Sequence, residues 1–265
     1  MKKITAFLLA ALASVATITA TAQSSAEELA KKLANPVASL ISVPFQNNLD
    51  VGIGPLEGYR NTLNFQPVIP VTLTPKMNLI ARAILPIMSQ KNITGEGQSQ
   101  SGLGDIVASA FLAPSESKNG LTWGAGPVLL IPTATNDFLG GKKFGVGPTA
   151  LVLKQIKGWT LGALANQIWS VAGDKDRQDI STMFVQPFVN YNWKSGAGIG
   201  GNLEITQNWK ADNTTIFFIP TVSGVTKLGT QTISMAVGPR IPLTAPNGSK
   251  PDFGVRAVVV FVFPK

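Results

Sequence analysis

Charged residues are scarce in this chain, yet four arginines lie in stretches where apolar and polar residues alternate one by one. Such alternation is typical of β-strands, in which successive side chains point to opposite faces of a sheet. Several arginines on one polar face attract anions, because low-dielectric walls focus their field. The residues of this polar face are Arg60, Asn64, Gln66, Arg82, Gln186, Asn190, Glu204, Thr206, Arg240 and Arg256.

The side chains on which most enzymes rely are missing. The chain contains neither Cys nor His, which excludes disulfides, thiolate chemistry, imidazole metal sites and Ser–His or Cys–His catalysis. The carboxylates form no paired motif, and the stretch DKDRQD at 174–179 lacks the glycine and distal glutamate of a calcium loop. We therefore expect no enzymatic activity, no metal site and no cofactor.

The elements that must hold the polar face are strands, because the alternation recurs along most of the chain. In LEITQNW at 203–209, Glu204 and Thr206 lie on one side and Ile205 and Trp209 on the other. Short and long connections alternate, as in outer-membrane barrels, whose short turns lie on the periplasmic side. An even number of strands puts both chain ends on that side. The candidate strands are 37–46, 61–73, 77–88, 103–113, 121–132, 144–155, 159–171, 180–192, 198–209, 214–226, 231–243 and 253–263.

The tryptophans indicate which face of these strands points outward. All five lie near predicted strand ends, where tryptophans on the apolar face form the two aromatic girdles of a membrane barrel. A soluble sandwich, the alternative, would bury its tryptophans in the middle of strands. We predict an all-β fold, a closed antiparallel transmembrane β-barrel of about 12 strands, whose apolar face meets lipid and whose polar face lines a lumen. The girdle residues are Trp123, Trp159, Trp169, Trp193 and Trp209.

The arginines should lie inside such a barrel. On the lipid face, an arginine near the bilayer midplane would cost roughly 2–4 kcal/mol, although one at the rim can reach the headgroups. Glu204 is the only carboxylate well inside a predicted strand, so we expect one arginine to pair with it and the remaining positive charge to face the pore. The alternative is that these residues only satisfy each other and fill space.

The composition agrees with a barrel and argues against two other classes. Charged residues make up 14% of the 265 residues, against roughly 25% in ordinary soluble proteins. Beyond residue 20 no apolar run reaches about 18 residues, so no transmembrane helix is expected. The net charge of +8 is scattered rather than clustered, which argues against nucleic acid as a partner.

The N-terminus has the pattern of a secretory signal. A basic start and an apolar core precede the small-residue site ATA at 20–22, so residues 1–22 are predicted to be cleaved; an uncleaved anchor is the alternative. Losing the two lysines of the signal lowers the charge from +8 to +6. Residues 23–36 are predicted to form a short amphipathic helix, either a solvated lead-in or a plug in the barrel mouth. Residues 37–265 are predicted to form the barrel.

Two features fit a closed, water-filled barrel less well. Proline has no N–H, so a proline inside a strand breaks a ladder bond unless a bulge hosts it. The recurring GAGPV, GVGPT and AVGPR predict a Gly-Pro bulge or kink. In addition, the strands at 121–132 and 144–155 have lumen faces of mostly Gly, Val and Leu, which are more apolar than a water-filled porin requires.

Several stretches of the chain resemble a known family. AEELAKKLANPVASLISVPFQNN, GYRNTLNFQPVIP, SGLGDIVASAF, GAGPVLLIPTAT, FGVGPTALVLKQ, GALANQIWSVAGD and VQPFVNYNWKSG are similar to bacterial outer-membrane transporters grouped under the MetA pathway of phenol degradation, some of which are mislabelled neuromedin U. The resemblance covers nearly all of the predicted mature chain. It implies an outer-membrane barrel and uptake of hydrophobic or aromatic compounds, with no catalytic residues to carry over. One departure is that Pro264 and Lys265 follow the terminal aromatic Phe263, which many such barrels use as an assembly signal.

The leading hypothesis is an outer-membrane channel or transporter for small hydrophobic or amphipathic solutes. About twelve strands make a lumen narrower than that of 16–18-stranded porins, so partial occlusion is expected. The expected partners are outer-membrane lipid, a small-molecule solute and the barrel-assembly machinery. The alternative is a non-conducting structural or binding β-barrel of the outer membrane or periplasm.

Overall fold

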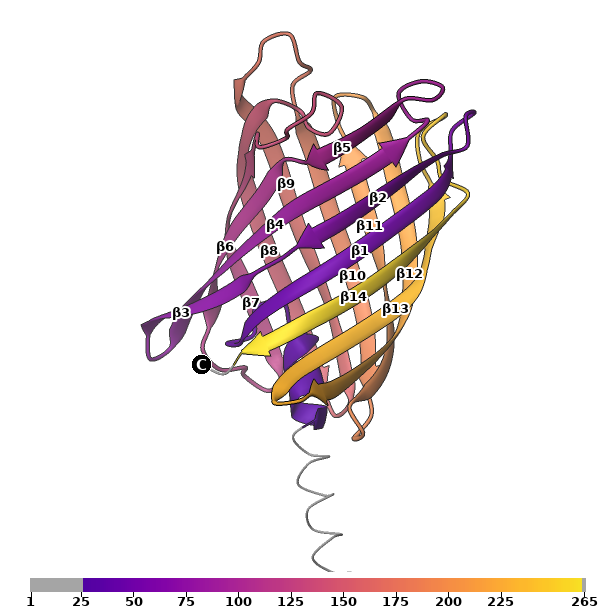
Figure 1. Cartoon of the computed structure of the whole chain (residues 1–265). Coiled ribbons are helices and arrows are strands. Elements are labelled where there is room, and N and C mark those ends of the chain that lie inside the picture. The colour runs from indigo at the N-terminus through magenta and orange to yellow at the C-terminus, as the bar shows by residue number, and fades with distance from the viewer. Residues whose placement is uncertain (1–25, 264–265) are drawn as a thin grey trace, which may run out of the picture.

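The wall of the molecule is one antiparallel sheet that closes on itself (Figure 1). The computed structural model describes residues 26–263. The first and last strands pair from Ile41 opposite Phe263 to Val51 opposite Phe253, which leaves no free edge there. The strands are β1 (Ile41–Ile53), β2 (Gly58–Phe65), β3 (Val68–Thr74), β4 (Met77–Lys91), β5 (Ser99–Leu103), β6 (Ile106–Pro114), β7 (Leu121–Ile131), β8 (Lys143–Ile156), β9 (Trp159–Gly173), β10 (Ser181–Asn192), β11 (Ala197–Asn208), β12 (Asn213–Leu228), β13 (Gln231–Thr244) and β14 (Phe253–Phe263).

These segments make a wall of 12 strands, because two strands of the wall are each divided in two. β2 and β3 pair with successive parts of β4, and β5 and β6 do the same along its other edge. The first break falls at Pro67, whose missing N–H cannot continue a ladder, and the second at Gly104 and Asp105. The predicted 12-stranded barrel is confirmed. The prediction of one continuous strand over 61–73 is wrong.

The connections differ between the two ends of the barrel. One end carries brief turns such as 75–76, 157–158 and 229–230, and the other carries the longer 132–142 and 245–252 connections. The N-terminal helix and the end of β14 both lie at the short-turn end (Figure 1). Both described ends of the chain are therefore where the even strand count predicts them.

The first strand differs from the sequence-based prediction. Residues 37–40 are not part of it, and β1 instead continues through Ile53 into the stretch that was predicted to be a loop. It keeps its pairing with β14 and β2 as far as Val51, because Asn48 and Asp50 continue the alternation of polar side chains. This extension brings a second carboxylate into the wall of the barrel.

The recurring Gly-Pro pairs are sites of close backbone approach rather than bulges. The β6–β7 ladder is interrupted between Ser109–Val128 and Leu112–Ala125, and its register is the same on both sides. A Cβ on Gly126 would overlap a backbone carbonyl oxygen of β6. The same overlap is found at the glycines of the other two Gly-Pro pairs, which approach Gln167 and Pro220. Glycine is therefore required there by space, and the predicted bulge is absent.

The N-terminal segment enters the barrel from the short-turn end. Residues 26–33 form a helix, and Gln155 donates a hydrogen bond of 2.8 Å to the carbonyl oxygen of Lys31. Val37 is only 4% exposed and belongs to a core cluster inside the barrel that includes Phe111 and Leu151. In the described part of the chain no helix is long and apolar enough to cross a membrane.

The outer surface is apolar and carries the tryptophans. All five indoles are on the outside, with exposed fractions between 44% and 53%. Trp123, Trp159 and Trp193 lie toward the short-turn end, whereas Trp169 and Trp209 lie toward the other end, on either side of Ser181. This distribution is the geometry that two lipid-facing girdles require.

Candidate functional site

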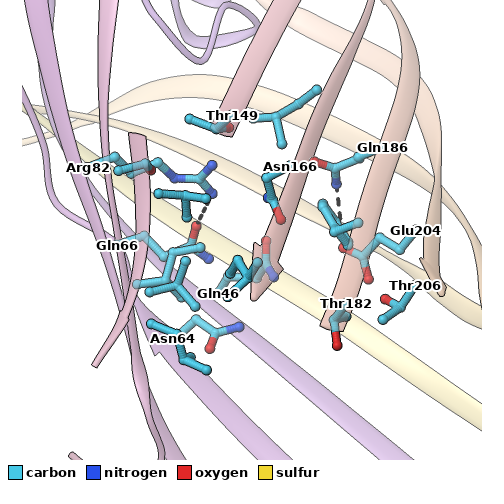
Figure 2. A pocket seen from close by; sticks show the side chains of 18 of the residues that line it. Gln46, Asn64, Gln66, Arg82, Thr149, Asn166, Thr182, Gln186, Glu204 and Thr206 are labelled. Atoms are coloured by element: carbon cyan, nitrogen blue, oxygen red, sulfur yellow. Dashed lines mark hydrogen bonds between the residues drawn. The ribbon is translucent and has the colours of Figure 1, made fainter. Parts of the chain in front are cut away.

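A cavity of about 500 Å³ occupies the middle of the barrel (Figure 2). Its wall is divided by chemistry. Amides and hydroxyls come chiefly from β1, β2, β10 and β11, and the charged groups come from β4, β11 and β14. β6, β7 and β9 supply most of the apolar side chains, among them Phe111, Val128, Leu130 and Leu164. The cavity therefore has one polar side and one apolar side.

The structure brings most of the predicted polar face together around this cavity. Arg60 lies nearer the long-loop end, where its Nε donates to Gln90 at 2.9 Å. Asn190 shares the inward face but lies outside the cavity, beside Gly200. Arg240 points inward but does not line the cavity. The predicted residues that line the cavity are Asn64, Gln66, Arg82, Gln186, Glu204, Thr206 and Arg256.

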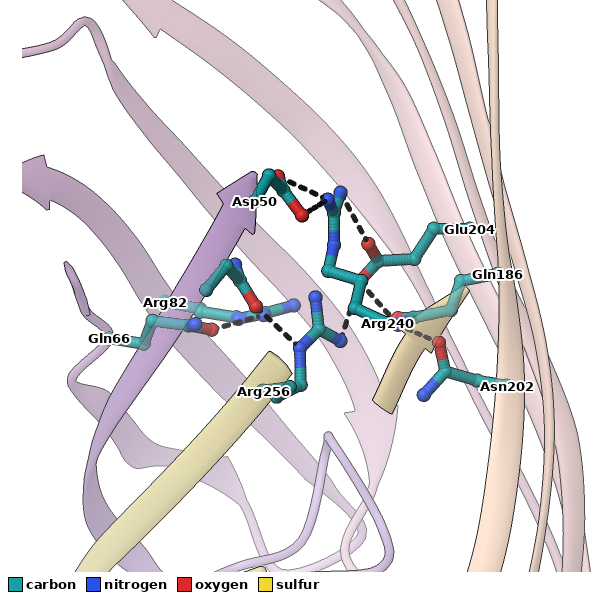
Figure 3. Close-up of polar contacts among 9 residues, drawn as sticks. Asp50, Gln66, Arg82, Gln186, Asn202, Glu204, Arg240 and Arg256 are labelled. Atoms are coloured by element: carbon teal, nitrogen blue, oxygen red, sulfur yellow. Dashed lines mark hydrogen bonds and ion pairs between the residues drawn. The ribbon is translucent and has the colours of Figure 1, made fainter. Parts of the chain in front are cut away.

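An ion-pair network crosses the seam of the barrel (Figure 3). Arg240 Nη1 contacts both carboxylate oxygens of Asp50, at 2.7 and 2.5 Å, and its Nη2 lies 3.6 Å from Glu204. Arg256 Nη1 pairs with the other oxygen of Glu204 at 2.8 Å, and its Nε donates to Asn48 at 2.7 Å. The four ionised side chains are 5% to 15% exposed, so solvent screens these pairs little.

Two further contacts hold this network in place. Gln186 donates from Nε2 to Glu204 at 3.4 Å and to Asn202 at 3.3 Å. The guanidinium carbon of Arg240 lies 3.4 Å from the ring centroid of Phe217, a cation–π contact. With these partners, Glu204 and Arg240 have one well-defined arrangement.

Asp50 is the residue that sequence reasoning missed. The prediction that Glu204 is the only carboxylate inside a strand is wrong, because β1 extends far enough to carry Asp50 on its inward face. The signal was present in the sequence, since Gln46, Asn48 and Asp50 continue a period of two. It was overlooked because Gly52 and Gly54 made the whole stretch resemble a loop.

Arg82 differs from the two arginines of the network. Its Nη2 donates to Gln66 at 2.7 Å, and within the described residues no carboxylate lies at salt-bridge distance from it. It lines both the central cavity and a cavity of about 170 Å³ beside the N-terminal segment. Arg60, Arg82, Arg240 and Arg256 against Asp50 and Glu204 give 4 − 2, or +2, around the lumen. Arg82 therefore holds an uncompensated positive charge at the cavity.

Comparison with known proteins now identifies the family. Residues 56–239 match the model of the family described as "Putative MetA-pathway of phenol degradation". The chain belongs to this family. No curated protein is significantly similar to it in sequence. The resemblance stated from the sequence motifs is thus confirmed.

A solved structure shares the fold of this MetA-pathway family member. It is described as the crystal structure of the COG4313 outer membrane channel from Pseudomonas putida F1. The match has a TM-score of 0.68 over 86% of this chain and 97% of that one, at 16% sequence identity. At that identity the likeness establishes the fold.

Chain segments are fastened at both ends of the barrel in this MetA-pathway protein. At the short-turn end the segment 32–40 borders the smaller cavity and covers it. At the long-loop end Asp105 accepts hydrogen bonds from the backbone of Ala134 at 3.1 Å and Gly141 at 2.7 Å, which folds the 132–142 loop onto the barrel. The central cavity therefore lies between these two folded segments.

A second loop is fastened at the same end. Lys143 Nζ donates to Asp179 at 3.0 Å, and this hydrogen bond is the main reason that the pKa of Asp179 is held below its ordinary value, with a smaller contribution from Ser170. Arg177 Nη2 donates to the backbone oxygen of Asp137 at 2.6 Å and so joins the 174–180 loop to the 132–142 loop.

Proposed function

We propose that the protein is an outer-membrane channel for small amphipathic solutes that have an apolar body and an anionic end. The observation that carries this proposal is the two-sided cavity, in which Arg82 offers an unpaired cation at the border of the apolar wall that contains Phe111 and Leu164. A low-dielectric wall strengthens the attraction of such a cation for an anion. Membership of the MetA-pathway family and the fold shared with an outer membrane channel support a transport role.

The proposed location is the outer membrane. The outer surface is a band of exposed aliphatic side chains bounded by tryptophans at both ends, which is the surface that lipid requires. In this orientation the short turns and the N-terminal segment face the periplasm. A solute would pass from the long-loop end, across Arg82, and leave once the segment 32–40 moves aside.

A reversal-potential measurement tests the proposal. Purified protein is inserted in a planar bilayer under a KCl gradient, and benzoate, benzylammonium and benzyl alcohol are then added in turn. We expect small single-channel currents that favour anions and that benzoate blocks at lower concentration than the other two. Cation selectivity, or equal block by all three probes, would contradict the proposal.

The closed short-turn end supports a second candidate, a barrel that binds its solute without conducting. Val37 is packed in the core cluster, so the segment that covers the mouth is firmly held. Saturable benzoate binding by protein that inserts into the bilayer and carries no current would favour this alternative.

A further inference from the structure

The outer surface carries a large apolar groove where a smooth wall is expected. The groove has a volume of about 640 Å³ and lies across the strands from β9 to β12, toward the short-turn end. Its sides are formed by Trp159, Val189, Ile199, Leu203 and Phe218. It is hollow because Gly201, which faces outward, supplies no side chain to that part of the wall.

A polar pocket adjoins this groove at the rim of the barrel. It has a volume of about 500 Å³, and Tyr191 lines both hollows. Lys157 and Lys194 lie on the two neighbouring turns that border the pocket, and both are exposed. Neither makes a salt bridge with any described residue, and Glu27, the acidic residue of the pocket, is already paired with Lys31 at 2.7 Å. The pocket therefore has an excess of positive charge.

Aromatic rings join the two hollows. The ring centroids of Trp159 and Tyr191 are 4.9 Å apart, and those of Tyr191 and Trp193 are 5.4 Å apart at nearly a right angle. Tyr and Trp combine an apolar body with a polar tip and are typical of the level at which lipid headgroups begin. The three rings lie at the boundary between the apolar groove and the cationic pocket.

We propose that this surface is a specific binding site for one anionic phospholipid of the periplasmic leaflet. An acyl chain fills the groove, and the phosphate lies between Lys157 and Lys194. The order of apolar groove, aromatic rings and lysines matches the order of the parts of a phospholipid along the membrane normal. The inference rests on the proposed outer-membrane location, but it is independent of whether the lumen conducts.

Native mass spectrometry of delipidated protein titrated with phosphatidylglycerol or phosphatidylcholine tests the site. Wild type should retain one phosphatidylglycerol at least tenfold more tightly than phosphatidylcholine. Lys157→Glu combined with Lys194→Glu should abolish that preference. The matched control, Lys76→Glu with Lys118→Glu, makes the same change of charge on the other short turns and should behave as wild type.

The groove is tested by filling it. A Cβ on Gly201 would meet only atoms at 3.4 Å or more, so Gly201→Leu fits the strand and places its side chain in the groove. It should weaken phosphatidylglycerol binding about tenfold, whereas Gly224→Leu, at an open position on the neighbouring strand β12, should not. Equal retention of both lipids by wild type, or unchanged binding in Gly201→Leu, would overturn the site.

A measurement on wild type alone remains decisive if the variants fail to fold. Phosphatidylglycerol with brominated acyl chains, at a low mole fraction in phosphatidylcholine vesicles, should quench tryptophan fluorescence more than brominated phosphatidylcholine at the same fraction. Equal quenching would show only a nonspecific lipid shell and would contradict the proposal. Single-channel recordings of the same preparations report separately on the channel function.

Discussion

Arg82 is the cavity cation whose hydrogen-bond partner is an amide rather than a carboxylate. If it attracts the anionic end of the solute, Arg82→Gln should weaken benzoate binding about tenfold, since a hydrogen bond to a charged group contributes about 1.5–3 kcal/mol. The reversal potential should also shift toward zero. Isothermal titration calorimetry and bilayer recordings measure the two effects. Arg177→Gln, in an external loop, is the control, and an equal loss in that variant would contradict a role for the lumen charge.

Glu204 holds a different position, because it is shared by two arginines. Glu204→Gln should leave Arg256 buried at 5% side-chain exposure without a carboxylate, whereas Arg240 keeps Asp50. Removing one partner of a buried pair costs roughly 3–5 kcal/mol. We expect a clearly lower midpoint of urea unfolding in detergent micelles. Because Arg82 has no carboxylate to leave behind, Arg82→Gln should change that midpoint little, and equal destabilisation of the two variants would refute this distinction.

At the scale of elements, the N-terminal segment borders the smaller cavity at the short-turn end and packs Val37 into the core of the barrel. Deleting residues 26–40 removes the helix, its contact with Gln155 and the segment that borders the smaller cavity, while the strands remain intact. We expect a severalfold increase in single-channel conductance. Glu27→Gln, which breaks only the 2.7 Å pair with Lys31, is the control and should leave conductance unchanged. The same small current from the deletion variant would show that the segment is not a gate.

The 174–180 loop is fastened by an ion pair whose pH dependence has a definite sign. Because the pKa of Asp179 is lowered in the folded protein, the stabilisation is present above the ordinary value of 3.8 and is lost as the pH falls through the lowered value. Asp179→Asn removes the pair at neutral pH, so trypsin should cut after Lys175 or Arg177 faster than in wild type. Asp212→Asn, in another loop at the same end, is the control. Unchanged cleavage in Asp179→Asn would mean that the Lys143 contact does not restrain the loop.

Strand alternation predicted the elements well where polar and apolar residues differ sharply, as in β11. It failed where a proline or glycine determines the end of a strand. Pro67 divides a run of otherwise suitable residues into β2 and β3, and the glycines after Asp50 concealed the end of β1. The polar face could be predicted because side chains alternate between the two faces along each single strand. The pairing of Asp50 with Arg240 could not be predicted, since it requires the closure of the barrel.

At the scale of the whole molecule, the outer surface predicts how the protein sits in lipid. All five tryptophans are outside, in two groups near opposite ends. Lipids brominated along the acyl chain should therefore quench most of the fluorescence, and the efficiency should be greatest for bromines near the headgroup. Protection of most of the tryptophans, or maximal quenching from the bilayer centre, would contradict the predicted girdles.

The pairing of β1 with β14 also sets a condition on how the chain folds. Arg240 and Asp50 are 190 residues apart, and Arg256 and Asn48 are 208 apart, so these contacts form only when the last strands meet the first. Contacts of such sequence separation form slowly, because a long loop must be closed before they contribute. A nascent wall that lacks β14 has no Arg256 for Asn48, and it is not closed, so Arg240 on β13 does not reach Asp50. The seam network therefore stabilises only the closed barrel. A barrel that is almost closed lacks these contacts and is much less stable.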